Sequence, residues 1–179
     1  MTCIAAFKHP SGAVHLASDR QMTIGWTKAD LLTPKIFQKG KFAYGVSGYA
    51  RIGDILQHVF HEPPRMADQT TLSYLSGSWV NAWRQCLQDC GVKQITHNED
   101  LQNSSILMIY EGRIFMISSN FSVSESSKYM AIGSGNEAAL GAFFAVCDYA
   151  PDTAAFIAVS AAIEHSVGCG GQIDQIKIE

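Results

Sequence analysis

The sequence predicts an α+β fold in four layers, with two antiparallel sheets stacked face to face and a pair of helices on each outer side. Short apolar segments separated by turn residues open the chain, return in the middle and close it, which is typical of strands and hairpins. Helical spacing of apolar residues appears twice, each time in two consecutive segments. Because the helices come in pairs and do not alternate with single strands, antiparallel sheets are favoured over a parallel α/β fold.

The first strands form hairpins. Residues 2–8 and 13–18 are apolar segments separated by HPSG, whose proline and glycine are turn residues, and residues 35–38 and 41–47 form a second pair around a short turn. The predicted sheet therefore begins at residue 2. Because chain ends are usually disordered, a strand at this position indicates that the terminus is held in place for a purpose.

The first helix pair follows directly. Apolar residues three and four apart predict a helix over residues 49–60, which the prolines of HEPP end. The same spacing predicts a second helix over residues 72–90, and Gly91 then stands where a helix C-terminus favours glycine.

The second half repeats this order. Residues 104–119 contain two apolar strands around a central turn, and residues 128–135 are a further strand that ends in glycines. Two alanine-rich segments, 136–149 and 152–166, predict the second helix pair. Residues 172–178 alternate as a closing strand.

Length and composition limit the function classes. A chain of 179 residues fits one domain over residues 1–179, and its low charged fraction of 16% favours an oligomer in which another subunit covers apolar surface. The net charge is −3 and no cluster of lysines and arginines is present, which argues against nucleic acid as a partner.

Neither metal nor cofactor is expected. The five cysteines form no CxxC pair and the histidines are scattered, so neither a disulfide framework nor a zinc site is indicated. No nucleotide-binding glycine motif occurs. The first residues have no basic segment and their apolar run is too short for a signal peptide or membrane span, so we expect a cytoplasmic protein without membrane contact.

Thr2 is the first candidate catalytic residue. It follows Met1, and a small residue at this position lets a methionine aminopeptidase remove the initiator. A threonine hydroxyl needs a base to attack a carbonyl, and a free α-amino group with a pKa of about 7.7–8.0 can be that base on the same residue. The arrangement also needs a cation, a carboxylate that fixes the cation, and a backbone N–H for the oxyanion.

Several segments supply these groups in order: TCI, LASDRQMTIG, TPKIF, AYGVSGYARIGDIL and AIGSG. Over nearly its whole length the chain resembles the proteasome β-subunit family of N-terminal-nucleophile hydrolases, including the simpler bacterial two-ring protease. The resemblance implies a threonine peptidase with the fold of that family. It places catalytic roles on Thr2, Asp19, Lys35, Gly45 and Ser134.

Each of these positions also has a simpler explanation. Asp19 alone would be a turn-capping aspartate, Lys35 a solvated strand end, and Ser134 a helix cap. The resemblance gives them specific roles: Asp19 fixes the lysine, Lys35 is the cation, and Ser134 assists proton transfer at the Thr2 amine. It puts the oxyanion N–H on Gly45. Five positions in the right order favour these roles over the simpler explanations.

The resemblance also implies a substrate site. Met22, Ala43 and Ser47 would line the pocket for the side chain before the cleaved bond, and the flexible, apolar Met22 favours apolar or mixed residues there. Thr23 and Gly135 would bind the substrate backbone as an added strand.

Two positions near the C-terminus depart from the family. Ser166 and Cys169 stand where archaeal and eukaryotic active subunits have an aspartate and a serine, so their support of the site is doubtful. The simpler bacterial relatives also lack that pattern. We therefore do not interpret the change as inactivation.

Assembly and partners are further implications of the resemblance. A stacked double ring of six or seven subunits per ring is expected, with polypeptide substrates and a ring-shaped unfolding ATPase as a candidate partner. Trp26, Trp79 and Trp83 are candidates for subunit contacts, although the core is the expected place for the last two. Two alternatives stay open: a catalytically inactive structural ring subunit that retains Met1, and an N-terminal-nucleophile amidase of a small acyl-amide.

Overall fold

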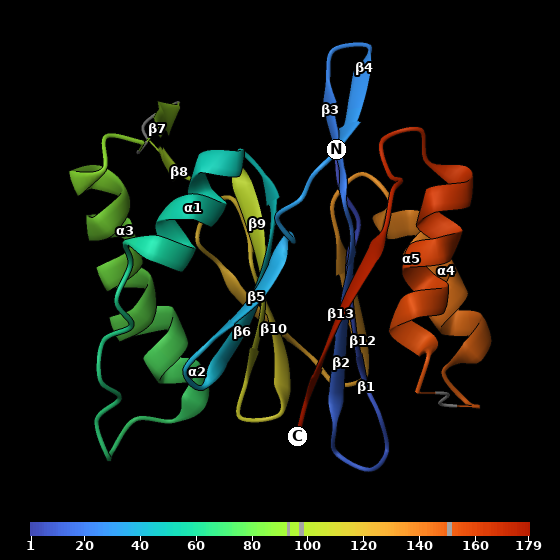
Figure 1. Ribbon diagram of the computed structural model, residues 1–179. Helices are drawn as coiled ribbons and strands as arrows, with labels where there is room; N and C mark the ends of the chain where they lie inside the picture. Colours follow the sequence, from blue (N-terminus) through green and yellow to red (C-terminus); the bar gives the residue numbers. More distant parts are fainter. Residues whose placement is uncertain (93, 97–98, 150–151) are drawn as a thin grey trace.

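A computed structural model describes residues 1–92, 94–96, 99–149 and 152–179. Figure 1 shows four layers: helices α1 and α3, a first sheet behind them, a second sheet, and helices α4 and α5. The predicted four-layer α+β fold is confirmed. Within the described residues the strands of the two large sheets are ordered β12-β1-β2-β13 and β11-β10-β9-β6-β5, and both sheets are antiparallel.

The four-stranded sheet carries the N-terminus. Its strands are β1 (Ile4–Lys8), β2 (Val14–Asp19), β12 (Tyr129–Ile132) and β13 (Ile173–Ile178). In this register Ile4 stands opposite Ser18 on one side and Ile132 on the other. The start of β1 is therefore held beside the ends of β2 and β12.

The five-stranded sheet lies against it. Its strands are β5 (Ile36–Lys39), β6 (Phe42–Gly48), β9 (Ser104–Tyr110), β10 (Arg113–Ile117) and β11 (Val123–Ser126). The sequence analysis did not predict β11. Only Val123 of its four residues is a large apolar one, so no apolar alternation marks it.

The helices agree with the predicted pairs. On one side lie α1 (Ala50–His58), α2 (Thr71–Ser73), a π-helical segment (Tyr74–Trp79) and α3 (Val80–Asp89). The last three run on from each other, which explains why one helix was predicted over this stretch. On the other side lie α4 (Asn136–Val146) and α5 (Ala154–His165).

Two short hairpins were not predicted. The hairpin of β3 (Gln21–Ile24) and β4 (Thr27–Asp30) projects beyond the sheets near the N-terminus in Figure 1. The second consists of β7 (Gln94–Thr96) and β8 (Glu99–Leu101). All four residues of β4 are exposed, so burial leaves no alternating pattern in its sequence.

Three apolar clusters fill the spaces between layers. Aromatic residues dominate between the five-stranded sheet and its helices, and Trp79 and Trp83 are fully buried there. Aliphatic side chains, among them Ile4 and Leu107, fill the space between the sheets. Alanines predominate under α4 and α5. Trp26 is fully exposed, so of the three tryptophans it alone is available at the surface.

Candidate active site

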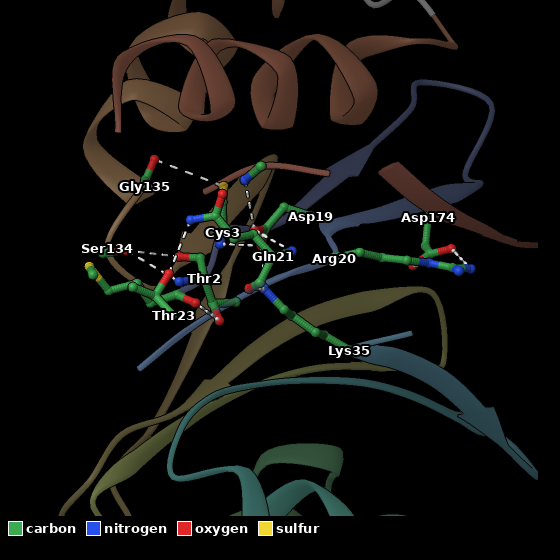
Figure 2. A network of polar contacts seen from close by, with 12 residues as sticks. Thr2, Cys3, Asp19, Arg20, Gln21, Thr23, Lys35, Ser134, Gly135 and Asp174 are labelled. Carbon is green, nitrogen blue, oxygen red and sulfur yellow. Dashed lines mark hydrogen bonds and ion pairs between the residues drawn. The ribbon is translucent and has the colours of Figure 1, made fainter. Parts of the chain in front are cut away.

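Thr2 lies immediately before β1, where the GSG segment after β12 holds its backbone (Figure 2). Its N–H donates to Ser134 Oγ at 3.2 Å, and its carbonyl oxygen accepts from the Gly135 N–H at 3.3 Å. The hydroxyl of Thr2 donates to the carbonyl oxygen of Met1 at 2.6 Å. The nitrogen that would become the α-amino group is thus already placed beside a serine hydroxyl.

Asp19 ends β2 and is fully buried. Its Oδ1 accepts from the backbone N–H of Cys3 at 2.9 Å and from Lys35 Nζ at 2.8 Å. Its Oδ2 accepts from the N–H groups of Gln21 at 3.2 Å and Gly170 at 3.1 Å. A buried carboxylate needs partners for its charge and lone pairs. Four donors provide them and fix the carboxylate beside the start of β1.

Lys35 precedes β5 and reaches across to the other sheet. Its side chain is 9% exposed, and its ammonium donates to Asp19 Oδ1 and, at 2.6 Å, to the carbonyl oxygen of Gln21. Lys35 and Thr2 line the same pocket. Asp19 therefore fixes the Lys35 ammonium in the pocket where a threonine hydroxyl would react. A positive charge near a hydroxyl favours loss of its proton.

Close contacts explain why glycines occupy both ends of the GSG segment. At Gly133 φ is +95°, and a Cβ there would lie 2.1 Å from the carbonyl oxygen of Thr2. A Cβ on Gly135 would lie 2.7 Å from Cys169 Sγ and 3.0 Å from Cys3 Cβ. Only glycine lets this segment approach Thr2 so closely.

A pocket of about 470 Å³ opens beside Thr2. Met22 and Thr23 line it, as predicted. Ala43 and Ser47 are not among the described residues that line it, because odd-numbered side chains of β6 point between the sheets. The other walls come from the segment before β5, from β5 and β6, and from α1. They include Leu31, Thr33, Pro34, Phe37, Val46, Gly48, Tyr49, Ala50, Gly53, Asp54 and Gln57.

The structure corrects the assignment of Gly45 as the oxyanion donor. A Cβ on Gly45 would lie 2.6 Å from the side chain of Ile4, so this glycine faces the space between the sheets. Backbone N–H groups alternate between the two neighbours of a strand. Val46 N–H points to the β5 side, where it donates to Lys35 O at 3.4 Å. The Gly45 N–H therefore points toward β9, where Leu107 stands opposite.

Gly48 fits the oxyanion position better. It ends β6, lines the pocket, and has a φ of +121° that favours glycine. Gly48 comes two residues after Val46, so its N–H points to the same side of β6, toward β5. At this point it lies beyond the first residue of β5. The direction of the N–H groups along β6 therefore favours Gly48 over Gly45 as the candidate donor within the motif AYGVSGYA.

Ser166 and Cys169 support the site only indirectly. Cys169 is buried, with its Sγ against Gly135, and its N–H donates to Ser166 O at 2.9 Å. Burial raises the pKa of the Cys169 thiol, and burial also raises the pKa of Cys3 to about 12. Both thiols therefore stay protonated near neutral pH. In the part of the chain that the structure describes, neither Ser166 nor Cys169 bonds to Thr2.

Sequence reasoning missed two groups of residues. Gln21 and Gly170 hold Asp19 through backbone N–H groups, which no side-chain motif can indicate. The pocket wall on α1 was also missed, although a signal for it exists. Its members are spaced i, i+3, i+4 and i+7 along the helix, opposite the buried stripe. They are Ala50, Gly53, Asp54 and Gln57.

Over the ranges that the structure describes, no group of three or more histidine, cysteine, aspartate or glutamate side chains is placed to hold a metal ion. Among those same ranges no helix has the length and apolar character that crossing a membrane requires.

The chain was compared with protein-family models, curated protein sequences and solved structures. No protein-family model and no curated protein sequence matches the chain. Among solved structures, BPH, a bacterial proteasome homologue from Thiobacillus denitrificans, is 24% identical with a TM-score of 0.84, over 99% of this chain and 97% of that one. The chain has the fold of the proteasome-type N-terminal-nucleophile hydrolases.

Two further structures agree with this fold. BPH in complex with epoxomicin is 23% identical, with a TM-score of 0.83 over 99% of this chain and 98% of that one. Eukaryotic HslV from Trypanosoma brucei is 19% identical, with a TM-score of 0.68 over 99% of both chains. The likeness spans each chain almost entirely, so the proteasome-type fold accounts for all the layers described above.

Proposed function

We propose that this chain is a threonine-type endopeptidase of a self-compartmentalising, proteasome-like ring, which cleaves peptide bonds through Thr2 Oγ after removal of Met1. One arrangement carries the proposal. Ser134 Oγ accepts from Thr2 N–H, and Lys35, paired with the buried Asp19, lines the same pocket as Thr2. A fold alone does not need a buried lysine at this place, whereas an N-terminal nucleophile does.

Removal of Met1 converts Thr2 N from an amide into an amine. The amine then takes the hydroxyl proton as Oγ attacks the substrate carbonyl, and it returns that proton to the leaving amine. The ester that forms is hydrolysed by water with the same amine as base. Lys35 stabilises the developing negative charge, and Ser134 Oγ, 3.2 Å from Thr2 N, orients the amine.

The oxyanion of the tetrahedral intermediate needs a backbone donor near Thr2. Gly48 takes this role in the proposal, because it lines the same pocket as Thr2 and its N–H is on the β5 side of the sheet. Thr23 lies on β3, whose second edge is free to pair with a substrate strand among the described residues. Gly135 is proposed to contribute on the opposite side.

Assembly into a ring is part of the proposal. The fold is that of BPH and HslV, and α4 and α5 are apolar nearly all round, with Phe144 and Phe156 exposed. Apolar helices of this kind are usually covered. A stacked double ring of six or seven subunits per ring, with polypeptide substrates and a ring-shaped unfolding ATPase, fits these features.

The alternative of a structural subunit that retains Met1 has a direct consequence for the site. The Met1 carbonyl accepts the Thr2 hydroxyl bond at 2.6 Å, and the Met1 side chain packs over Gly168. In this state the hydroxyl is occupied and no free amine is available. Retention of Met1 would therefore leave the chain inactive.

Peptide hydrolysis by variants at position 2 tests the proposal. The chain is co-expressed with methionine aminopeptidase, its N-terminal residue is confirmed by mass, and cleavage of fluorogenic peptides is measured. Thr2→Ala is the matched control, because alanine also permits Met1 removal and lacks the hydroxyl, together with one methyl group. We expect its kcat to fall by about 10³-fold or more, while Thr2→Ser keeps measurable activity. Equal rates for Thr2→Ala and the unchanged chain would contradict the proposal.

A further inference from the structure

The wall of the pocket opposite Thr2 is one face of α1. Ala50 and Gly53 have small or no side chains and leave space beside this face, since the nearest side-chain atom to a Cβ placed on Gly53 would be the Cβ of Val46 at 3.8 Å. Asp54 and Gln57 stand beside them on the same face, at spacings of one and four residues from Gly53. The helix therefore offers space with polar groups at its border.

Asp54 brings a charge that nothing in the site neutralises. Two described charged side chains line the pocket, Lys35 and Asp54. Lys35 is already paired with Asp19. Asp54 is exposed, and within the described ranges it has neither an ion pair nor a hydrogen bond from its side chain. Among the described side chains that line the pocket, Asp54 therefore carries the one charge that is not paired.

Nearby basic side chains on α1 do not pair with this charge. Arg51 and His58 lie three residues before and four residues after Asp54, so both are its neighbours along the helix. Both are exposed and neither is a described lining residue of the pocket. A ligand inside the pocket therefore meets the carboxylate and not these two basic side chains.

The remaining walls are mainly apolar. Met22, Leu31, Phe37 and Val46 line the same pocket as Thr2 and Asp54. A long side chain bound there can therefore contact apolar residues as well as the carboxylate. Lysine and arginine have this build, because an apolar stem carries a cationic head that stays near water. The exposed position of Asp54 suits such a head.

We infer that this pocket selects a lysine or arginine side chain next to the cleaved bond, with Asp54 as the residue that determines this specificity. The inference rests on the proposed peptidase function and names its substrate class. It replaces the expectation of an apolar or mixed preference, which was based on Met22 alone. Gln57 can donate a hydrogen bond to the substrate but adds no charge.

Matched fluorogenic tripeptides test the inference. They differ only in the residue before the cleaved bond, which is arginine, the neutral norleucine or glutamate. We expect kcat/KM for the arginine peptide to exceed that for norleucine by about tenfold, the value of one charge-assisted contact, and the glutamate peptide to be the poorest. Added salt should reduce the ratio, because the carboxylate is exposed.

Variants at Asp54 make the test specific. Asp54→Asn should bring the arginine-to-norleucine ratio close to one, and Asp54→Lys should reverse the preference toward glutamate. Asp68→Asn is the matched control, since Asp68 is exposed and does not line the pocket. Its ratio should equal that of the unchanged chain.

The outcomes separate two kinds of failure. If peptides are cleaved in a Thr2-dependent way but norleucine is preferred, and Asp54→Asn leaves the ratio unchanged, the inference is wrong and the proposed function stands. If no peptide is cleaved and Thr2 forms no adduct with a reactive peptide epoxyketone, the proposed function fails and the inference fails with it. An arginine preference that Asp54→Asn abolishes supports both.

Discussion

The two halves of the sandwich contribute different things to one site. The half with α4 and α5 has an alanine-rich core and holds Thr2, Asp19 and Ser134 through buried polar contacts. The half with α1 and α3 has an aromatic core and supplies the pocket wall, including Asp54. Lys35, which precedes β5 of this second half, reaches across to Asp19.

Under the proposed function, the first half carries the reacting groups and the second half the groups that select the substrate. Small residues let α5 and the GSG segment approach β1 closely, so each group around Thr2 has little freedom to move. The face of α1 has open space and an unpaired charge. Substitutions in the first half should therefore impair folding and rate together, whereas those on α1 should change the choice of substrate.

The largest contrast is expected between two aspartates. Asp19→Asn leaves Lys35 as a buried charge without its partner and turns an amide NH₂ toward N–H donors, so unfolding free energy should fall by about 3–5 kcal/mol. Asp54→Asn, at an exposed position, should change it by no more than about 0.5 kcal/mol. Urea denaturation of both variants measures this. Equal losses would show that the halves do not differ in this way.

A pair of glycines gives a smaller contrast. Gly133→Ala places a Cβ 2.1 Å from Thr2 O at a φ of +95°, so a loss of about 1–3 kcal/mol and of most activity is expected. Gly53→Ala finds room on α1 and should stabilise the helix by about 0.5–1 kcal/mol. Thermal unfolding and peptide cleavage distinguish them. A stable, active Gly133→Ala variant would contradict the close packing around Thr2.

The smallest expected effect is the contribution of His15, in the half with α4 and α5, to the pH dependence of stability. Burial lowers the pKa of His15, against the opposite influence of Asp152, while Lys177 and His9 lower it further. The unfolded chain then binds more protons than the folded one below the ordinary histidine pKa of about 6.5, so stability falls as pH falls through this range.

His15→Asn isolates this contribution. The variant should lose less unfolding free energy than the unchanged chain between pH 7.5 and pH 5.5, as urea denaturation at both values measures. His15 is not among the described residues that line the pocket beside Thr2, so peptide cleavage at pH 7.5 serves as the control. An identical pH dependence of stability in both chains would show that His15 titrates alike in the folded and unfolded states.

Much of the fold could be predicted because burial leaves a periodic pattern. Buried strands such as β9 and the stripe of α1 alternate at the spacing of their secondary structure. The β3–β4 hairpin could not be recognised this way, since β4 is wholly exposed. Its role in lining the pocket depends on where it projects, which tertiary packing decides.

The site could be predicted only where side chains identify it. Asp19, Lys35 and Ser134 are brought together beside Thr2 as the motifs suggested. The choice between Gly45 and Gly48 depends on which way each N–H points along β6, and sequence alone does not fix that direction. The same limit applies to Gly170, which acts through its backbone.

The central claim is that Thr2 becomes an N-terminal nucleophile. The most direct measurement is the intact mass of the purified chain before and after incubation with a peptide epoxyketone, a reagent that closes a ring with both the hydroxyl and the amine of an N-terminal threonine. We predict a chain without Met1 that gains one adduct, and no adduct on Thr2→Ala. A chain that lacks Met1 and still gains no adduct, or one that reacts equally as Thr2→Ala, would contradict the claim.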